Sequence, residues 1–270
     1  MNGVLELQVR GVGLLGPGFD DWNSGRGLLA DPAAWQLAPT VLPAPARLPP
    51  AERRRAGAIV KACLAVADQA CAQAGIDPQG LATVFSASTG DAANCHALCE
   101  ALAMPERLVS PTRFTNSVHN ASAGYWHIAT ASRAPSTSLS AHDASFAAGL
   151  LEAASQAVAW ARPVLLVAAD VPYPEPLRAT RPIPDAMAVA LLLDPSAAAP
   201  APAPALARLS IALDNAAADT LAHEGLERLR RQVPAAQALP LLQRLARGEA
   251  GTCTVGYHEG LSLRVGLMPA

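Results

Sequence analysis

The sequence predicts an α/β fold with a mixed or parallel sheet, because short apolar runs of strand length alternate with longer segments of helical periodicity. The chain has 270 residues, of which 51% are hydrophobic and only 16% are charged. This composition excludes long-range disorder and is sufficient for a sizeable buried core. The length suits one or two domains.

The N-terminal elements are a strand and, after an irregular excursion, a long helix. Residues 4–15 alternate apolar and polar side chains and then reach a Gly-Pro-Gly turn, which is typical of a strand closed by a turn. Residues 19–50 are rich in Pro and Gly, so we expect irregular structure with room for one short helix. Apolar positions at helical spacing predict a helix over residues 51–75 that ends at Gly75.

The rest of the chain repeats this alternation of strands and helices. A dense cluster of polar and aromatic side chains occupies residues 110–134, and the Ala/Pro stretch 197–205 is typical of a linker or surface loop. The expected helices are residues 91–103, residues 143–161 and a helical region within 216–248. The expected strands are residues 81–88, 137–141, 163–170, 186–193, 206–213, 252–258 and 261–268.

Charge and cysteine usage exclude several classes of protein. The net charge is −2 and the basic residues form no stripe, so nucleic-acid binding has no electrostatic basis. Five cysteines, an odd number, do not suggest a disulfide framework. The Cys95-His96-Cys99 group closes poorly around a metal, and no cofactor motif is present. No signal peptide or membrane span is recognised, so we expect a cytoplasmic protein.

Residues 140–145 (SAHDAS) form the most informative local motif, because a short strand here runs into a long helix of small residues. Ser140 or Asp143 can cap this helix, the turn can present a nucleophile, or it can contact a ligand. Two other strings are weaker. Residues 86–90 lack the first glycine of the G-x-S-x-G motif, which forms the nucleophile turn between a strand and a helix in many hydrolases. Residues 11–16 match the glycine spacing of a dinucleotide-binding motif but precede no convincing helix, so we interpret them as a strand-end turn.

Four segments resemble the condensing enzymes of the thiolase superfamily, and more narrowly the N-terminal half of β-ketoacyl-acyl-carrier-protein synthases. They are LPPAERRRAG at 48–57, VFSASTGD at 84–91, the fairly specific stretch 110–157, and VLLVAADVPYPEPL at 164–177. The resemblance implies a thiolase-like mixed β-sheet with helices on both faces. It implies one ketosynthase-like half at residues 1–196, the linker at 197–205, and a shortened C-terminal α/β segment at 206–270 that packs on the same domain.

The departures from this family concern catalysis. In active ketosynthases the elbow ends in Ala-Cys, and laying residues 136–145 over that pattern puts Asp143 at the position of the nucleophile with His142 before it. The two downstream histidine motifs are absent, since only His223 and His258 follow. A carboxylate attacking a thioester gives a hydrolysable anhydride, whereas a thiolate at a helix N-terminus is well suited. We therefore expect no condensation by this chain alone.

The resemblance thus implies a non-condensing subunit of the chain-length-factor type, as in aryl polyene or xanthomonadin-type pathways. Such a subunit pairs through strand 137–141 with an active β-ketoacyl synthase, shapes its acyl pocket and works with an acyl carrier protein in fatty-acid or polyene-type biosynthesis. Two alternatives remain open. One is a stand-alone acyl-thioester decarboxylase or hydrolase that uses His142 and Asp143, and the other is an acyl or carrier-protein binding module. The residues expected to bind substrate are Phe114, Asn116, His119 and Phe146.

Overall fold

An eight-stranded mixed sheet organises the chain, for which a computed structural model describes residues 3–195 and 203–270. Most of the expected linker 197–205 lies outside these residues. The strand order is β3-β2-β4-β5-β1-β6-β8-β7, with β2 parallel to β3 and β4 and the other pairs antiparallel. All strands predicted from the sequence are present. They are β1 (Leu5–Leu15), β2 (Ala82–Ser86), β3 (Ser136–Leu139), β4 (Val164–Asp170), β5 (Met187–Asp194), β6 (Ala207–Asp214), β7 (Gly251–His258) and β8 (Leu261–Pro269).

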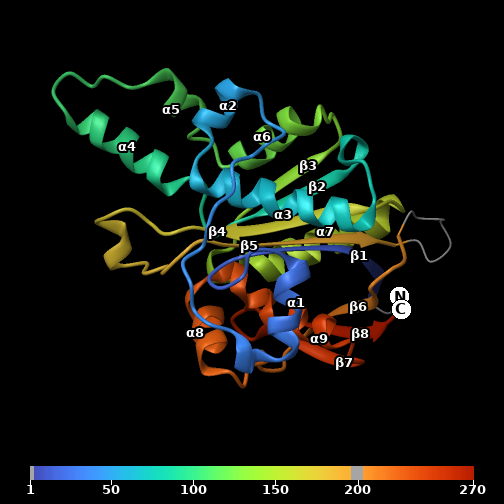
Figure 1. Cartoon of the computed structure of the whole chain (residues 1–270). Helices are drawn as coiled ribbons and strands as arrows, with labels where there is room; N and C mark the ends of the chain where they lie inside the picture. Colours follow the sequence, from blue (N-terminus) through green and yellow to red (C-terminus); the bar gives the residue numbers. More distant parts are fainter. Residues whose placement is uncertain (1–2, 196–202) are drawn as a thin grey trace.

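Helices cover both faces of this sheet (Figure 1). Helices α3 and α6 lie on one face. Helix α7 lies on the other, where it contacts the central strands as well as β7 and β8. Helices α8 and α9 complete this second layer. The bounds are α1 (Trp22–Ala30), α2 (Pro50–Arg55), α3 (Ala58–Ala74), α4 (Ala92–Ala103), α5 (Pro111–Thr115), α6 (Ala121–Thr130), α7 (Ser145–Trp160), α8 (Glu224–Gln232) and α9 (Leu239–Arg247).

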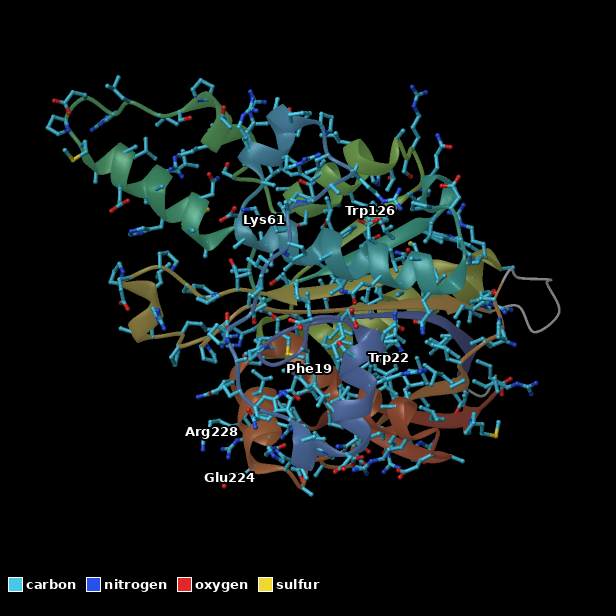
Figure 2. All side chains as sticks on the ribbon, in the orientation of Figure 1. Phe19, Trp22, Lys61, Trp126, Glu224 and Arg228 are labelled. Atoms are coloured by element: carbon cyan, nitrogen blue, oxygen red, sulfur yellow. The ribbon has the colours of Figure 1, made fainter. Side chains whose placement is uncertain are left out.

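Two hydrophobic cores follow from the two-residue period of the strands. In β4, Val164, Leu166 and Ala168 pack toward α7, whereas the intervening Leu165, Val167 and Ala169 pack toward α3. Figure 2 shows Trp126 on the α3 side of the sheet and Phe19 and Trp22 on the other. A sheet buried on both faces requires apolar side chains at successive positions, and this explains the unbroken apolar runs in the sequence. The expected mixed sheet with helices on both faces is confirmed.

The glycines of the string at residues 11–16 have a packing role inside β1. A Cβ atom at Gly11 would overlap the Ala70 carbonyl, and one at Gly13 would overlap the Val66 carbonyl, so the α3 backbone approaches the strand only because these positions carry no side chain. The interpretation of this string as a strand-end turn is therefore wrong for Gly11 and Gly13.

The single helix predicted over residues 51–75 is in fact two helices. Helix α2 ends at Arg55, and Gly57 has an extended backbone before α3 begins. A Cβ at Gly57 would overlap the Asp91 carboxylate, so a contact from a distant segment fixes the break. The predicted end of the helix is confirmed, because Gly75 adopts the left-handed conformation and its N–H bonds the last turn of α3.

Two segments extend beyond the body at the carboxyl ends of β2 and β4 (Figure 1). The first carries α4 and α5, and the second is the loop of residues 171–186, which contains a short 3₁₀ turn at Leu177–Ala179. Within the described residues, none of the helices combines the length and apolar character needed to cross a membrane.

Candidate functional site

The strand-to-helix elbow between β3 and α7 is the centre of the candidate site. After β3 the chain passes Ser140 and Ala141, makes a 3₁₀ turn at His142–Ala144, and enters α7. His142 has φ +54°, in the left-handed region that residues other than glycine rarely adopt. Strain of this kind persists only where the surroundings enforce it, and it accumulates at functional turns. The strained residue of the elbow is therefore His142, one position before Asp143.

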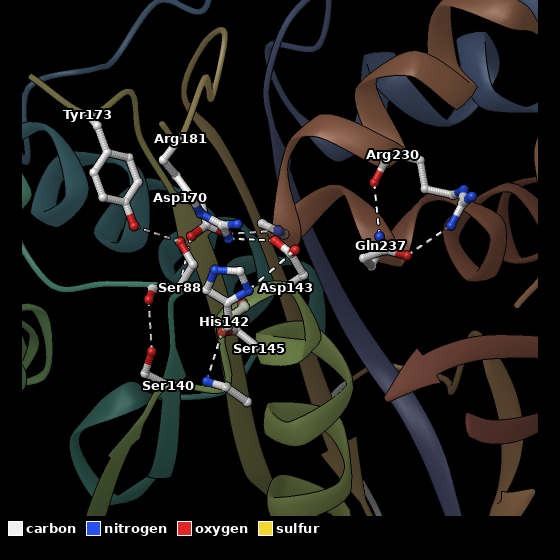
Figure 3. Close-up of polar contacts among 12 residues, drawn as sticks. Ser88, Ser140, His142, Asp143, Ser145, Asp170, Tyr173, Arg181, Arg230 and Gln237 are labelled. Atoms are coloured by element: carbon white, nitrogen blue, oxygen red, sulfur yellow. Dashed lines mark hydrogen bonds and ion pairs between the residues drawn. The ribbon is translucent and has the colours of Figure 1, made fainter. Parts of the chain in front are cut away.

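Asp143 forms an ion pair instead of capping the helix. Its carboxylate accepts a hydrogen bond from the Arg181 guanidinium at 2.5 Å and lies 3.4 Å from His142 Nδ1 (Figure 3). Ser140 Oγ donates to the Ser88 carbonyl at 2.9 Å. Neither side chain caps the helix, so capping by Ser140 or Asp143, the first of the three possibilities considered from the sequence, is wrong. The Asp143 carboxylate is instead satisfied by the guanidinium of Arg181, so that both partners of the bond are charged.

The hydroxyl of Ser145 stabilises the turn from within. It accepts a hydrogen bond from the Ala141 N–H at 3.0 Å and donates to the His142 carbonyl at 2.7 Å. These two bonds close the turn around His142 and hold its backbone in the left-handed region. Ser145 is almost fully buried, so this arrangement is shielded from water.

Asp170, at the carboxyl end of β4, lies beneath the elbow and connects three segments. Its carboxylate accepts hydrogen bonds from the Ser88 N–H and the Ala235 N–H, both at 2.8 Å. Burial raises the pKa of Asp170 to about 6, although the bonds from Ser88 and Ala235 and the charge of Arg181 oppose the shift. Asp170 is only 2% exposed, so desolvation is the dominant cause.

A pocket of about 390 Å³ opens in front of the elbow. Residues 141–144 form one wall, and the turn between β7 and β8 forms another. Arg230 lies in the pocket wall but is bonded to both oxygens of Glu227 and to Gln237, so its charge is already neutralised. The polar side chains that line the pocket are His142, Asp143, Arg230, Gln237, Tyr257, His258 and Glu259.

The substrate-binding residues expected from the sequence lie apart from this pocket. Phe114 is 69% exposed on α5, and Asn116 follows that helix, where its amide donates to the Tyr125 hydroxyl at 3.1 Å. His119 lies between α5 and α6, next to Gly90. Phe146 is fully buried in the core on the α7 side of the sheet. None of the four lines the pocket in front of the elbow.

Arg181 and the β7–β8 turn are the parts of the site that sequence reasoning missed. Arg181 lies 38 residues beyond Asp143, in a segment without a recognisable motif, so no local signal indicates the pair. His258 stands out in the sequence only as a histidine that does not match the ketosynthase motifs. The hairpin formed by β7 and β8 brings His258 and Glu259 to the elbow. A contact between residues so far apart in the chain cannot be recognised from the spacing of residues along the sequence.

The chemistry available at the elbow lacks a thiol. Cys63, Cys71 and Cys253 are buried, and burial raises the pKa of each to about 12, while Cys95 and Cys99 are exposed on α4. The side chains of His142 and Asp143 are 72% and 66% exposed, and Arg181 holds the carboxylate of Asp143. Among the described residues, no group of three or more His, Cys, Asp and Glu side chains fits a metal ion.

The family model described as the β-ketoacyl synthase N-terminal domain matches residues 29–258. The chain belongs to this family. The elbow at residues 140–145 therefore lies within a β-ketoacyl synthase N-terminal domain. No curated protein matches the chain.

Solved structures show the same fold over nearly the whole chain. A ketosynthase in complex with its chain length factor, from Xenorhabdus doucetiae, is 24% identical with a TM-score of 0.70, and the match covers 97% of this chain and 99% of that one. The ishigamide ketosynthase/chain length factor is 14% identical with a TM-score of 0.69, covering 98% and 99%. A β-ketoacyl synthase from Burkholderia phymatum is 12% identical with a TM-score of 0.65, covering both chains completely. The thiolase-like fold expected from the sequence is confirmed.

Proposed function

We propose that this protein is a non-condensing ketosynthase-like subunit, of the chain-length-factor type, that pairs with an active β-ketoacyl-acyl-carrier-protein synthase and shapes its acyl pocket. The observation that carries the proposal is the elbow, which presents an imidazole and an arginine-paired carboxylate where condensation needs a thiolate. We place it in fatty-acid or polyene-type biosynthesis in the cytoplasm.

The chemistry of the elbow supports a subunit without condensing activity. Attack of Asp143 on a thioester would give an anhydride that water destroys, and its pairing with Arg181 further weakens it as a nucleophile. Because the strained backbone falls on His142, this residue is an equally good candidate for the position of the missing cysteine. In either alignment the chain has no thiolate to hold a growing acyl group.

The surface around β3 supports pairing with another protein. Within the described sheet β3 is an edge strand, as pairing through strand 137–141 requires, and its side chains carry no charge and no proline. Helices α6 and α7, which contact β3, expose Ile128, Val158 and Trp160. Exposed apolar side chains next to an unpaired edge are typical of a covered interface.

The names of the similar structures agree with this kind of partner. Two of them pair a ketosynthase with a chain length factor. A further similar structure, 12% identical with a TM-score of 0.75 and covering 98% of this chain and 99% of that one, is described as a type II acyl carrier protein in complex with its ketosynthase. By analogy, we propose an active synthase and an acyl carrier protein as the partners of this chain. Phe114, Asn116 and His119 would then face the acyl chain from the α5–α6 segment, whereas Phe146 lies in the core on the opposite, α7, face of the sheet and would not belong to that wall.

Co-expression with the active synthase of the same pathway tests the proposal. The chain alone should form no β-ketoacyl product from acyl and malonyl carrier proteins, and the co-purified pair should form one. Phe114→Ala in the pair should lengthen the product, because it removes bulk from the pocket wall, whereas Leu37→Ala, an equally exposed apolar residue on another face, should not. Elongation by the isolated chain would contradict the proposal.

One observation favours a second candidate, a stand-alone acyl-thioester hydrolase or decarboxylase. His142 and His258 line the same pocket, and acid–base chemistry needs two positioned groups. Under this candidate the isolated chain releases free thiol or carbon dioxide from acyl or malonyl thioesters, and His142→Ala abolishes the release. A chain that binds acyl carrier protein but neither a synthase nor a thioester substrate would instead be a binding module.

A further inference from the structure

The loop of residues 171–186 extends from the body, and its end is tied to Thr40, whose N–H and hydroxyl donate to the Asp185 carboxylate and the Ala186 carbonyl, each at 2.8 Å. Its 3₁₀ turn at Leu177–Ala179 exposes Leu177, and the buried Ile183 anchors its return toward β5. The N–H groups of Arg178, Ala179, Thr180 and Arg181 are all hydrogen-bonded within the loop. The loop therefore has internal structure, but that structure alone does not fix its position against the rest of the chain.

The side chain of Arg181 reaches from this loop under the elbow. It is only 21% exposed, and its Nη2 bonds the Asp143 carboxylate (Figure 3). Tyr173, at the start of the loop, interacts with Arg181, and its hydroxyl lies 3.5 Å from Ser88 Oγ. The positive charge of Arg181 also acts on the buried Asp170. One guanidinium thus compensates two carboxylates that belong to different elements.

The same contacts close into a network around the elbow. Ser88 receives the hydroxyl of Ser140 at its carbonyl and gives its own N–H to Asp170, which also binds the Ala235 N–H. The β2–α4 connection, the elbow, the end of β4 and the segment before α9 are therefore joined through a few polar side chains. Arg181 and Tyr173 are the members of this network that belong to the projecting loop, and Arg181 is the charged one.

We propose that Arg181 is a positioning residue that locks loop 171–186 onto the elbow through Asp143, so that loop and elbow present one fixed surface. Asp143 then stabilises the elbow through the ion pair that its carboxylate forms with Arg181. The further statement that this surface docks on the synthase rests on the proposed function. The loop of residues 171–186 and the α4–α5 segment extend from the same end of the sheet (Figure 1).

Hydrogen exchange at the bonded amides of residues 178–181 reports on the lock, because Arg181 ends the turn that these amides form and its ion pair holds that end against the elbow. Asp143→Asn and Arg181→Gln should each raise their exchange rates about threefold to tenfold, because the ion pair is partly exposed and of moderate strength. Arg181→Lys keeps the charge and should restore much of the protection. Arg178→Gln, an exposed arginine of the same loop without this ion pair among the described contacts, is the matched control and should leave the rates unchanged for the neighbouring amides.

Unchanged hydrogen-exchange rates at residues 178–181 in Asp143→Asn would contradict the proposal that the ion pair locks the loop. This variant keeps the test decisive even if Arg181→Gln fails to fold, because Asp143 is mostly exposed and its amide replacement is conservative. Affinity for the active synthase, measured by titration, separates the lock from the proposed function. If the variants exchange their amide hydrogens faster but the protein never binds a synthase, the ion-pair lock is upheld and the proposed function is rejected. If the protein binds the synthase normally and exchange in the variants is unchanged, only the lock is rejected.

Discussion

At the scale of single residues, Asp170 dominates the electrostatics of the site because its carboxyl group is almost completely buried. Burial raises its pKa to about 6, so the folded state holds a proton at pH values where the unfolded chain has already released it. Between about pH 4 and pH 6 the folded protein therefore binds more protons at this group than the unfolded chain does. The contribution of Asp170 to the free energy of unfolding decreases over this interval as the pH rises.

We expect Asp170→Asn to remove this pH dependence. Between pH 4.5 and pH 7.5 the free energy of unfolding of the wild type should fall by about 2 kcal/mol relative to that of the variant, at roughly 1.4 kcal/mol for each unit of pKa shift. Urea unfolding of both proteins at the two pH values measures this difference. Glu227 serves as a contrast, because its bond to Arg230 lowers its pKa and makes its contribution disappear as the pH falls. A constant difference between wild type and Asp170→Asn would show that Asp170 is charged throughout.

At the scale of elements, helix α7 ends in a way that its sequence does not favour. Ala161 adopts the left-handed conformation with φ +49°, and its N–H bonds the carbonyls of Ala157 and Val158. Glycine is the usual residue at this position because it has no Cβ to clash with the carbonyl that follows. The chain thus accepts strain at the end of its central helix.

The same substitution should have opposite effects at two neighbouring positions of α7. Ala161→Gly should raise the free energy of unfolding by about 1 kcal/mol, because it relieves the left-handed strain. Ala159→Gly, two residues earlier and exposed within the helix, should lower it by about 1 kcal/mol, because glycine costs helical stability. Chemical unfolding of the two variants and the wild type checks both signs. If both variants lose stability, the strain at Ala161 is negligible.

The comparison of elements also shows what the sequence could reveal. Strand β4 and helix α7 could be predicted because each is a long apolar segment. The pattern of apolar residues within each segment is enough to indicate its secondary structure. The break before α3 was not predictable, since Asp91 lies far along the chain from Gly57. The elbow is predictable as a strand-to-helix turn, but its partner Arg181 is not, because ion pairs between distant loops leave no local pattern.

At the scale of the whole molecule, the described sheet has two edges of different character. Strand β3 is short and uncharged and lies between helices that expose apolar side chains. Strand β7 forms the other edge, and α9, which contacts it, keeps its leucines buried or half-buried. The chain between α4 and α6 also exposes Leu108, Phe114 and Val118. An obligate interface of this kind buries roughly 2,000 Å² or more, which far exceeds what single exposed side chains provide.

This difference between the edges predicts which one pairs with the active synthase. Ser138→Lys places a charge in the middle of β3, where a partner strand would bury it without a counter-ion, and should weaken the heterodimer about a hundredfold. Thr252→Lys introduces the same side chain at an exposed position of β7 and should leave the affinity unchanged. Sedimentation velocity of each variant mixed with the synthase measures both effects, and equal thermal unfolding of the two isolated variants shows that neither substitution damages the fold. Loss of pairing in Thr252→Lys but not in Ser138→Lys would assign the interface to β7, and no loss in either would remove both edges from the interface.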